Sequence, residues 1–301
     1  MSLLLTTLRN LWNSDSGQRH PWKITARFAR LQLRRRLSSK PIIFETVTGT
    51  RALVEPTGDF SAITGLYYHQ IPDLHEVVFA CHALREGDCF LDIGSNQGYW
   101  SLLLAGRGIE AHACEPTPVT FANLQKQIAL QDEPFRRLLH GHNVALSDRV
   151  GRMRFVVGRG QANYLLKEGE TTTEPTAEVE VTTLDNLGEK FPPAFIKIDV
   201  EGWMLPVIRG GAKTLANPRL IGLAIETFRF ADGETPEIVE MERLLAEHGF
   251  LPYDYDPAKR VLRPLIVRKE GRQDTLYLRV DDALRARLAN AAPVRCLGDS
   301  H

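Results

Sequence analysis

The sequence predicts an α/β fold in which helices cover both faces of a mostly parallel sheet, and two observations support this expectation. From residue 89 to residue 248, short apolar runs alternate with helix-forming stretches, which is typical of repeated strand and helix units. The first unit, residues 89–116, joins two buried runs through a glycine turn that opens a helix. A final run at residues 275–280 is expected to be an antiparallel strand.

The first 40 residues form a basic leader. They hold nine Lys and Arg side chains against Asp15 alone, a net charge of +8, so the rest of this neutral chain carries −8. Ile24, Phe28 and Leu31 recur at helical spacing, which predicts a basic amphipathic helix over residues 23–37. We favour docking of this helix on the acidic remainder of the chain. Peripheral association with an anionic membrane and contact with nucleic acid stay open as alternatives.

Residues 41–68 follow as a small β substructure, because short apolar runs are broken by turn residues at 48–49 and 56–59. A helix is expected over residues 74–84. The core strands are expected at 89–93, 110–115, 137–145, 194–199 and 220–226, with helices at 97–105, 117–129, 203–215 and 236–248.

Two further features complete the predicted organisation. Residues 152–157 and 178–182 alternate like the strands of a hairpin around a long polar span, which is typical of a lid or substrate loop. Residues 250–254 precede the final strand. We expect four parts: the leader at 1–40, a β and helix substructure at 41–88, a ligand-binding domain at 89–282 and a tail at 283–301.

Composition excludes several classes of protein. The chain is 43% hydrophobic and 25% charged, as expected for a globular protein with a sizeable core, and it has no apolar run near the roughly 20 residues of a membrane span. A cytoplasmic location is the default expectation. The four cysteines have no C-x-x-C spacing, and His140 and His142 lack an obvious third ligand, so neither a disulfide framework nor a zinc site is predicted.

The candidate functional residues share one position in the predicted fold. Each lies at the carboxyl end of a core strand: Asp92, Glu115, Asn143, Asp199 and Glu226. Ligands of parallel sheets bind outside these strand ends. The small and polar residues after the third strand could frame an adenine ring, although a plain turn explains them equally well.

The turn after the first core strand indicates the ligand. Gly94 and Gly98 permit a positive φ or the close approach of a ligand, although a tight turn alone would also need them. Glu115 lies 23 residues past Asp92, where a carboxylate would accept hydrogen bonds from ribose hydroxyls. The turn is not G-x-G-x-x-G, and an acid at its start suits a sulfonium or amino group better than a pyrophosphate. The pattern therefore favours S-adenosylmethionine over NAD.

A second cluster follows the fourth core strand. Lys197, Asp199 and Glu201 alternate along an extended chain, so their side chains point the same way. A structural ion pair would explain this arrangement. The functional interpretation is that Asp199 is a general base or a ligand to a divalent ion, with Glu226 as the second oxygen donor.

Several segments together resemble the FkbM family of S-adenosylmethionine-dependent methyltransferases over about residues 40–280: DIGSNQGYWS, ACEPTPVTFANLQKQI, NVALSDRVG, FIKIDVEGWMLPVIRGG and TLYLRV. The resemblance implies the class I methyltransferase sheet of seven strands with the last antiparallel. It also implies methyl transfer to a hydroxyl of a small molecule, sugar or polyketide, with the methyltransferase domain at 89–282.

The resemblance also implies a set of cofactor-binding residues: Asp92, Gly94, Asn96, Gly98, Glu115, Asn143 and Ala145. Within this set the turn residues hold the methionine part, Glu115 holds the ribose, and the last two flank the adenine. Asp199 would lie near the transferred methyl, with Glu226 as the second catalytic acid. Trp203 departs from the family pattern, because a small residue is more usual there, and its bulk would narrow the acceptor space.

Three alternatives are weighed against this interpretation. A nicotinamide-dependent oxidoreductase would share the sheet but needs the missing third glycine, and a non-catalytic adenosyl-binding protein would not need Asp199. Methylation of nucleic acid is suggested by the leader, but no N/D-P-P-Y/F element follows the fourth strand. We therefore expect a small-molecule or carbohydrate acceptor and no nucleic acid partner.

Overall fold

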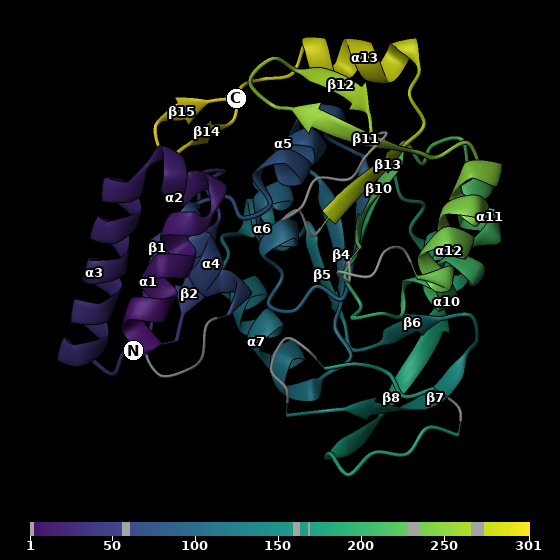
Figure 1. The fold of residues 1–301 in the computed structure, drawn as a ribbon, viewed down its shortest axis with the longest axis horizontal. Coiled ribbons are helices and arrows are strands. Elements are labelled where there is room, and N and C mark those ends of the chain that lie inside the picture. The colour runs from purple at the N-terminus through teal and green to yellow at the C-terminus, as the bar shows by residue number, and fades with distance from the viewer. Residues whose placement is uncertain (1–2, 56–60, 159–162, 168, 228–234, 266–273) are drawn as a thin grey trace.

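A central sheet organises the protein (Figure 1). The computed structural model describes residues 3–55, 61–158, 163–167, 169–227, 235–265 and 274–301. The sheet has eight strands in the order β12 (Val261–Pro264), β11 (Leu251–Asp256), β13 (Asp274–Leu278), β10 (Gly222–Glu226), β9 (Phe195–Ile198), β3 (Cys89–Ile93), β4 (Glu110–Cys114) and β5 (Leu139–His142).

The strand directions confirm the predicted topology. The run from β10 through β9, β3 and β4 to β5 is parallel, and β13 pairs antiparallel with both β10 and β11. The sheet has one strand more than the seven expected, because β11 turns back to form a hairpin with β12. Five carboxyl strand ends therefore meet at one rim.

Apolar side chains alternate between the two faces of the central strands, which is why helices cover both. In β9, Phe195 joins one core cluster while Ile196 and Ile198 join the other. Figure 1 shows the helices of the second face, α10 (Met204–Arg209), α11 (Ala212–Ala216) and α12 (Pro236–Glu247), to the right of the sheet. The helices of the first face are α5 (Leu74–Ala83), α6 (Tyr99–Ala105) and α7 (Pro118–Ala129).

Two predicted elements are divided in the structure. The strand expected at 137–145 ends at His142, and the chain then leaves the central sheet to form β6 (Ala145–Ser147) in a second sheet. The helix expected at 203–215 breaks at Gly210 and Gly211. A Cβ on Gly210 would collide with the Ser147 carbonyl oxygen, so the backbones pack directly against each other there.

The second sheet contains the predicted hairpin, and it lies at the bottom of Figure 1. β7 (Gly151–Val156) pairs antiparallel with β8 (Thr176–Thr183), whose other edge pairs parallel with β6. Residues 159–162 and 168 of the intervening span lie outside the described residues. The short helix α9 (Leu184–Lys190) follows β8, and α8 (Glu133–Arg136) lies earlier in the chain, between α7 and β5.

The leader forms α1 (Leu3–Asn13), α2 (Asp15–Arg19) and α3 (Pro21–Leu37), and α3 confirms the predicted amphipathic helix. Ile24, Phe28 and Leu31 are buried, so this face of α3 docks on the protein itself.

The β substructure expected at residues 41–68 is wrong in part. β1 (Ile42–Glu45) and β2 (Arg51–Val54) form a hairpin, but residues 62–69 form helix α4 (Ala62–His69). The six consecutive residues from Ile63 to Tyr68 are all buried, so the protein surrounds this helix on every side. The turn expected at 56–59 lies outside the described residues.

The C-terminal tail, residues 283–301, packs against helix α5 and against the leader. α13 (Asp282–Ala289) contacts α5, and β14 (Arg295–Cys296) pairs with β15 (Asp299–Ser300). Asp299 then accepts a 2.8 Å hydrogen bond from His20 Nε2. None of the helices within the described ranges combines the length and the apolar character needed to span a bilayer.

Candidate active site at the carboxyl rim

A cavity of about 1090 Å³ opens at the carboxyl rim of the sheet. Its lining includes seven of the nine residues expected to form the site: Asp92, Gly94, Asn96, Glu115, Ala145, Asp199 and Glu226. Gly98 and Asn143, the other two expected residues, do not line it. These seven residues span 134 positions of the sequence, from Asp92 to Glu226.

The glycine turn is shaped by close backbone packing. Gly94 has a φ of 77°, and a Cβ there would collide with the Asp199 carbonyl oxygen. Gly98 also has a φ of 77° and faces a methyl group of Leu124. Asn96 is left-handed at a φ of 52°, which directs its backbone N–H to Glu115 Oε2 at 3.2 Å. Gly94, Ser95 and Asn96 of this turn line the cavity.

Asp92 is 2% exposed at the end of β3. Its Oδ2 accepts a 2.7 Å hydrogen bond from Ser101 Oγ on α6. Burial raises the pKa of Asp92 to about 6, because an ionised carboxylate loses hydration in this position. A cationic ligand group in the cavity would favour the ionised form.

Glu115 follows β4 and is 6% exposed. Its Oε1 accepts a 2.8 Å bond from the Thr117 backbone N–H, in addition to the Asn96 bond on Oε2. Burial raises the pKa of Glu115 to about 7. The two backbone bonds fix the carboxylate, and each oxygen keeps a lone pair for a further donor.

Asn143 lies next to this loop, but its side chain does not line the cavity. Its Nδ2 donates to the carbonyl oxygens of Glu115 at 2.8 Å and Pro116 at 2.9 Å. Val144 and Ala145 line the wall instead. Asn143 therefore positions the loop that carries Glu115, and its expected contact with adenine stays a prediction.

A buried cation links the acids of the fourth core strand to the last strand. Lys197 Nζ lies 2.7 Å from Asp274 Oδ1 and 3.5 Å from Asp199 Oδ2. Burial acts to raise the pKa of Asp199, but Lys197 and a hydrogen bond with Glu226 bring it below its usual value. Burial raises the pKa of Asp274 although Lys197 opposes that shift. Asp199 is thus ionised at neutral pH.

Glu226 and Glu201 complete the acid cluster. Carboxylate oxygens of Asp199, Glu201 and Glu226 lie within 4.8 Å of one another. Burial and the neighbouring Asp199 raise the pKa of Glu226 well above its usual value. Glu226 is therefore protonated at neutral pH and shares its proton with Asp199.

Sequence reasoning missed several lining residues. Asp274 pairs in register with Glu226, because the antiparallel direction of β13 brings its first residue to the rim where the parallel strands end. Asp73, which accepts hydrogen bonds from Tyr99 and Trp100, comes from the turn before α5. Asp274 could have been found by reading the antiparallel strand from its start.

The leader also reaches the cavity, which the sequence did not indicate. Ser16 and Gln18 of α2 line it, as does His69 at the end of α4. Ser16 Oγ lies 2.6 Å from His69 Nδ1, and burial lowers the pKa of His69 to about 4, so this ring is neutral.

Trp203 lines the cavity as expected, and its indole N–H donates a hydrogen bond to Ser147 Oγ at 3.1 Å.

The parallel strands, the antiparallel β13 and the acids around the glycine turn define the class I fold of S-adenosylmethionine-dependent methyltransferases. The chain belongs to the methyltransferase FkbM domain family, whose family model matches residues 92–252.

Comparison with solved structures gives distant likenesses. An FkbM methyltransferase from Methylobacillus flagellatus KT is 13% identical with a TM-score of 0.44, and the match covers 91% of this chain. The chain spans 58% of the length of that protein. Fibrillarin from Aeropyrum pernix with bound S-adenosyl-L-methionine is 10% identical, with coverage of 65% and 67% and a TM-score of 0.35. An rRNA methylase from Streptococcus thermophilus is 12% identical, with coverage of 69% and 95% and a TM-score of 0.38. No curated protein matches the chain.

Proposed function

We propose that this protein transfers a methyl group from S-adenosylmethionine to a hydroxyl oxygen of a small molecule or carbohydrate. The observation that carries this proposal is the rim cavity, into which the fixed carboxylate of Glu115 and the ionised Asp199 both open beside a glycine turn. Family membership supports the donor, and the acid cluster supports an oxygen acceptor that must lose a proton.

The cavity residues fit the donor. Glu115 has lone pairs for two ribose hydroxyls, because its two backbone bonds leave both oxygens able to accept. Asp92 offers negative charge to the amino group or sulfonium, and Gly94, which also lines the cavity, lets the turn pack directly against the Asp199 backbone. A pyrophosphate would meet buried acids at both ends, so the same residues disfavour NAD.

S-adenosylmethionine supplies an electrophilic methyl on a sulfonium. Asp199 is assigned the removal of the acceptor's hydroxyl proton. An attacking hydroxyl becomes strongly acidic as its new bond to carbon forms, so even a carboxylate of lowered pKa can take the proton. The protonated Glu226 donates to Asp199 and holds it in place. Lys197 keeps Asp199 ionised until the proton arrives.

The primary experiment separates binding from turnover. Asp199→Asn should retain affinity for S-adenosylhomocysteine by calorimetry, while transfer of labelled methyl to a metabolite extract should fall by about 10²- to 10⁴-fold. NAD should not compete in the same titration. Unchanged transfer by Asp199→Asn would overturn the base assignment, and label in RNA rather than in small molecules would overturn the acceptor class.

The same acid cluster suits a divalent ion if Glu226 loses its proton, because carboxylate oxygens are the ligands that Mg²⁺ and Ca²⁺ prefer. Dialysis of the enzyme against EDTA separates the two roles. Full activity after dialysis supports Asp199 as base, whereas activity that returns only with Mg²⁺ supports a metal ligand.

The leader supports peripheral association with an anionic membrane, as a second part of the proposal. α3 exposes an apolar stripe on the face opposite its buried one, formed by Trp22, Ala26, Ala29, Leu33 and Leu37. Trp22, Leu33 and Leu37 are 84%, 58% and 75% exposed. Five of the eleven large exposed apolar side chains on described residues belong to α1 and α3. Self-docking through Ile24, Phe28 and Leu31 therefore explains only one of the helix's two apolar faces.

Basic residues flank this stripe. Lys23, Arg30, Arg34 and Arg36 are exposed on α3, and Lys or Arg near an anionic bilayer contributes roughly 1 kcal/mol each. The purified protein should sediment with vesicles of phosphatidylcholine and phosphatidylglycerol, more weakly at high salt, and not with phosphatidylcholine alone. A variant with Trp22, Leu33 and Leu37 replaced by Ala should lose binding, whereas Val239→Ala on α12 is a matched control with an exposed apolar residue. Equal sedimentation of these two variants would contradict this part.

A further inference from the structure

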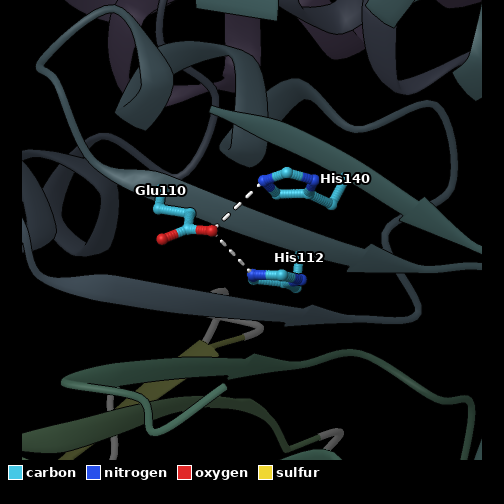
Figure 2. Close-up of side chains that lie close together, drawn as sticks. All are labelled: Glu110, His112 and His140. Carbon is cyan, nitrogen blue, oxygen red and sulfur yellow. Dashed lines mark hydrogen bonds and ion pairs between the residues drawn. The ribbon is translucent and has the colours of Figure 1, made fainter. Parts of the chain in front are cut away.

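A cluster of histidine and glutamate side chains lies away from the rim cavity, on β4 and β5 (Figure 2). Glu110 Oε1 lies 3.3 Å from His112 Nε2 and 3.2 Å from His140 Nε2. The sequence offered no third ligand beside His140 and His142, because Glu110 and His112 lie about 30 positions earlier in the chain. The pairing of neighbouring strands brings them together.

The strand backbones place the three side chains on one face. Glu110 and His112 are two residues apart on β4, so they point to the same side of the sheet. His140 is the register partner of His112 in the parallel pair with β5. Figure 2 shows all three side chains directed toward one another from these two strands.

Neighbouring groups orient the His112 ring. His112 is 2% exposed and stacks on Phe191 with ring centroids 3.7 Å apart. Its Nδ1 lies 3.0 Å from His142 Nε2, so a proton on Nδ1 directs a lone pair on Nε2 toward Glu110. The His140 Nε2 atom is buried, and it forms no hydrogen bond with the described residues. In this tautomer His112 Nε2 and Glu110 Oε1, 3.3 Å apart, can both coordinate a cation placed between them.

We propose that Glu110, His112 and His140 bind a zinc ion, with water as the fourth ligand. Tetrahedral zinc with bonds of about 2.0–2.1 Å separates its ligand atoms by about 3.3–3.4 Å, close to the two distances from Glu110. Imidazole with one carboxylate suits zinc, whereas Mg²⁺ and Ca²⁺ prefer all-oxygen sites. The planes of the His112 and His140 rings lie at only 18° to each other, so their nitrogen atoms do not converge on one point. On zinc binding, the more exposed His140 ring would tilt to direct its Nε2 atom at the ion.

The position of the site indicates a structural role. None of its three ligands lines the rim cavity. Glu110 begins β4 and Glu115 follows its end, which places the two sites about 17 Å apart along the strand. β5 is the last strand of the sheet on this side, so a zinc ion held by residues of β4 and β5 would clamp the edge strand.

The test measures metal directly on the full chain. After dialysis against EDTA, titration with zinc should show one equivalent bound, and the melting temperature should rise with zinc. His140→Ala and Glu110→Gln should weaken binding by at least about tenfold, and His142→Ala, which removes an orienting group, by about 10- to 100-fold. Cobalt in the same site should give the visible absorption of a tetrahedral ion.

Matched variants locate the ion. Glu201→Gln alters the acid cluster at the rim and should keep the zinc equivalent, as should His248→Ala on a surface outside both clusters. Glu110→Gln keeps an oxygen acceptor, so its melting temperature without metal should equal that of the wild type. Absence of zinc binding, or binding lost in Glu201→Gln and kept in His140→Ala, would overturn the proposal.

Discussion

Replacement of the buried Lys197 by Met tests how the rim acids are held. Lys197 is 3% exposed and lies between Asp274 at 2.7 Å and Asp199 at 3.5 Å. Met keeps most of the volume of the side chain and removes its charge. The variant therefore leaves Asp274, which is itself 9% exposed, without its cation.

The magnitude follows from the burial of this pair. Removal of one partner from a buried ion pair costs about 3–5 kcal/mol, because the remaining charge is neither hydrated nor paired. We expect a loss of this size in the free energy of unfolding at alkaline pH, where Asp274 is ionised in both the folded and the unfolded state. A double variant that also carries Asp274→Asn should recover most of it, since no uncompensated buried charge remains.

The pH dependence gives the sharper result. Without Lys197 the folded-state pKa of Asp274 lies further above its unfolded value, since burial already raises it. The variant is fully destabilised when the pH lies above the folded-state pKa of Asp274. The destabilisation disappears as the pH falls toward the pKa of Asp274 in the unfolded chain. The free energies of urea unfolding of wild type and variant should therefore converge as the pH falls to about 5. A loss below about 1 kcal/mol, or a difference independent of pH, would refute the reasoning.

Three further predictions concern binding and stability. Burial raises the pKa of Glu115 to about 7, so the fraction of its carboxylate form increases between about pH 6 and pH 8. Calorimetry should show affinity for S-adenosylhomocysteine rising over this range in the wild type. The rise should be smaller in Glu115→Gln, where only Asp92, with a pKa of about 6, still ionises. Gly94→Ala should lose cofactor affinity, because its Cβ meets a carbonyl oxygen in a left-handed turn. Gly87→Ala, which has a φ of 86° and open space around it, should show only the conformational cost of about 1–2 kcal/mol in urea unfolding. Tyr255→Phe removes the hydroxyl 2.7 Å from buried His82 Nδ1 and should cost about 1–3 kcal/mol of stability with cofactor affinity unchanged.

Local patterns in the sequence predicted most of the elements around the site. The glycine turn after β3, the acids after β4 and β9, and the hairpin of β7 and β8 all lie where their spacing placed them. The errors fall where tertiary packing overrides a local pattern. Residues 62–69 resemble strand locally but pack as a helix, and Gly210 breaks a helix because the Ser147 backbone lies against it.

The sequence by itself determined the alternation of strands and helices and the acids at the carboxyl strand ends, because side-chain periodicity is a local property of the backbone. Only the tertiary structure decided which distant groups meet. Asp274 reaches Lys197 because β13 runs antiparallel, and His140 reaches Glu110 because β4 and β5 pair in parallel register. Such contacts depend on strand order and register, which no single segment encodes.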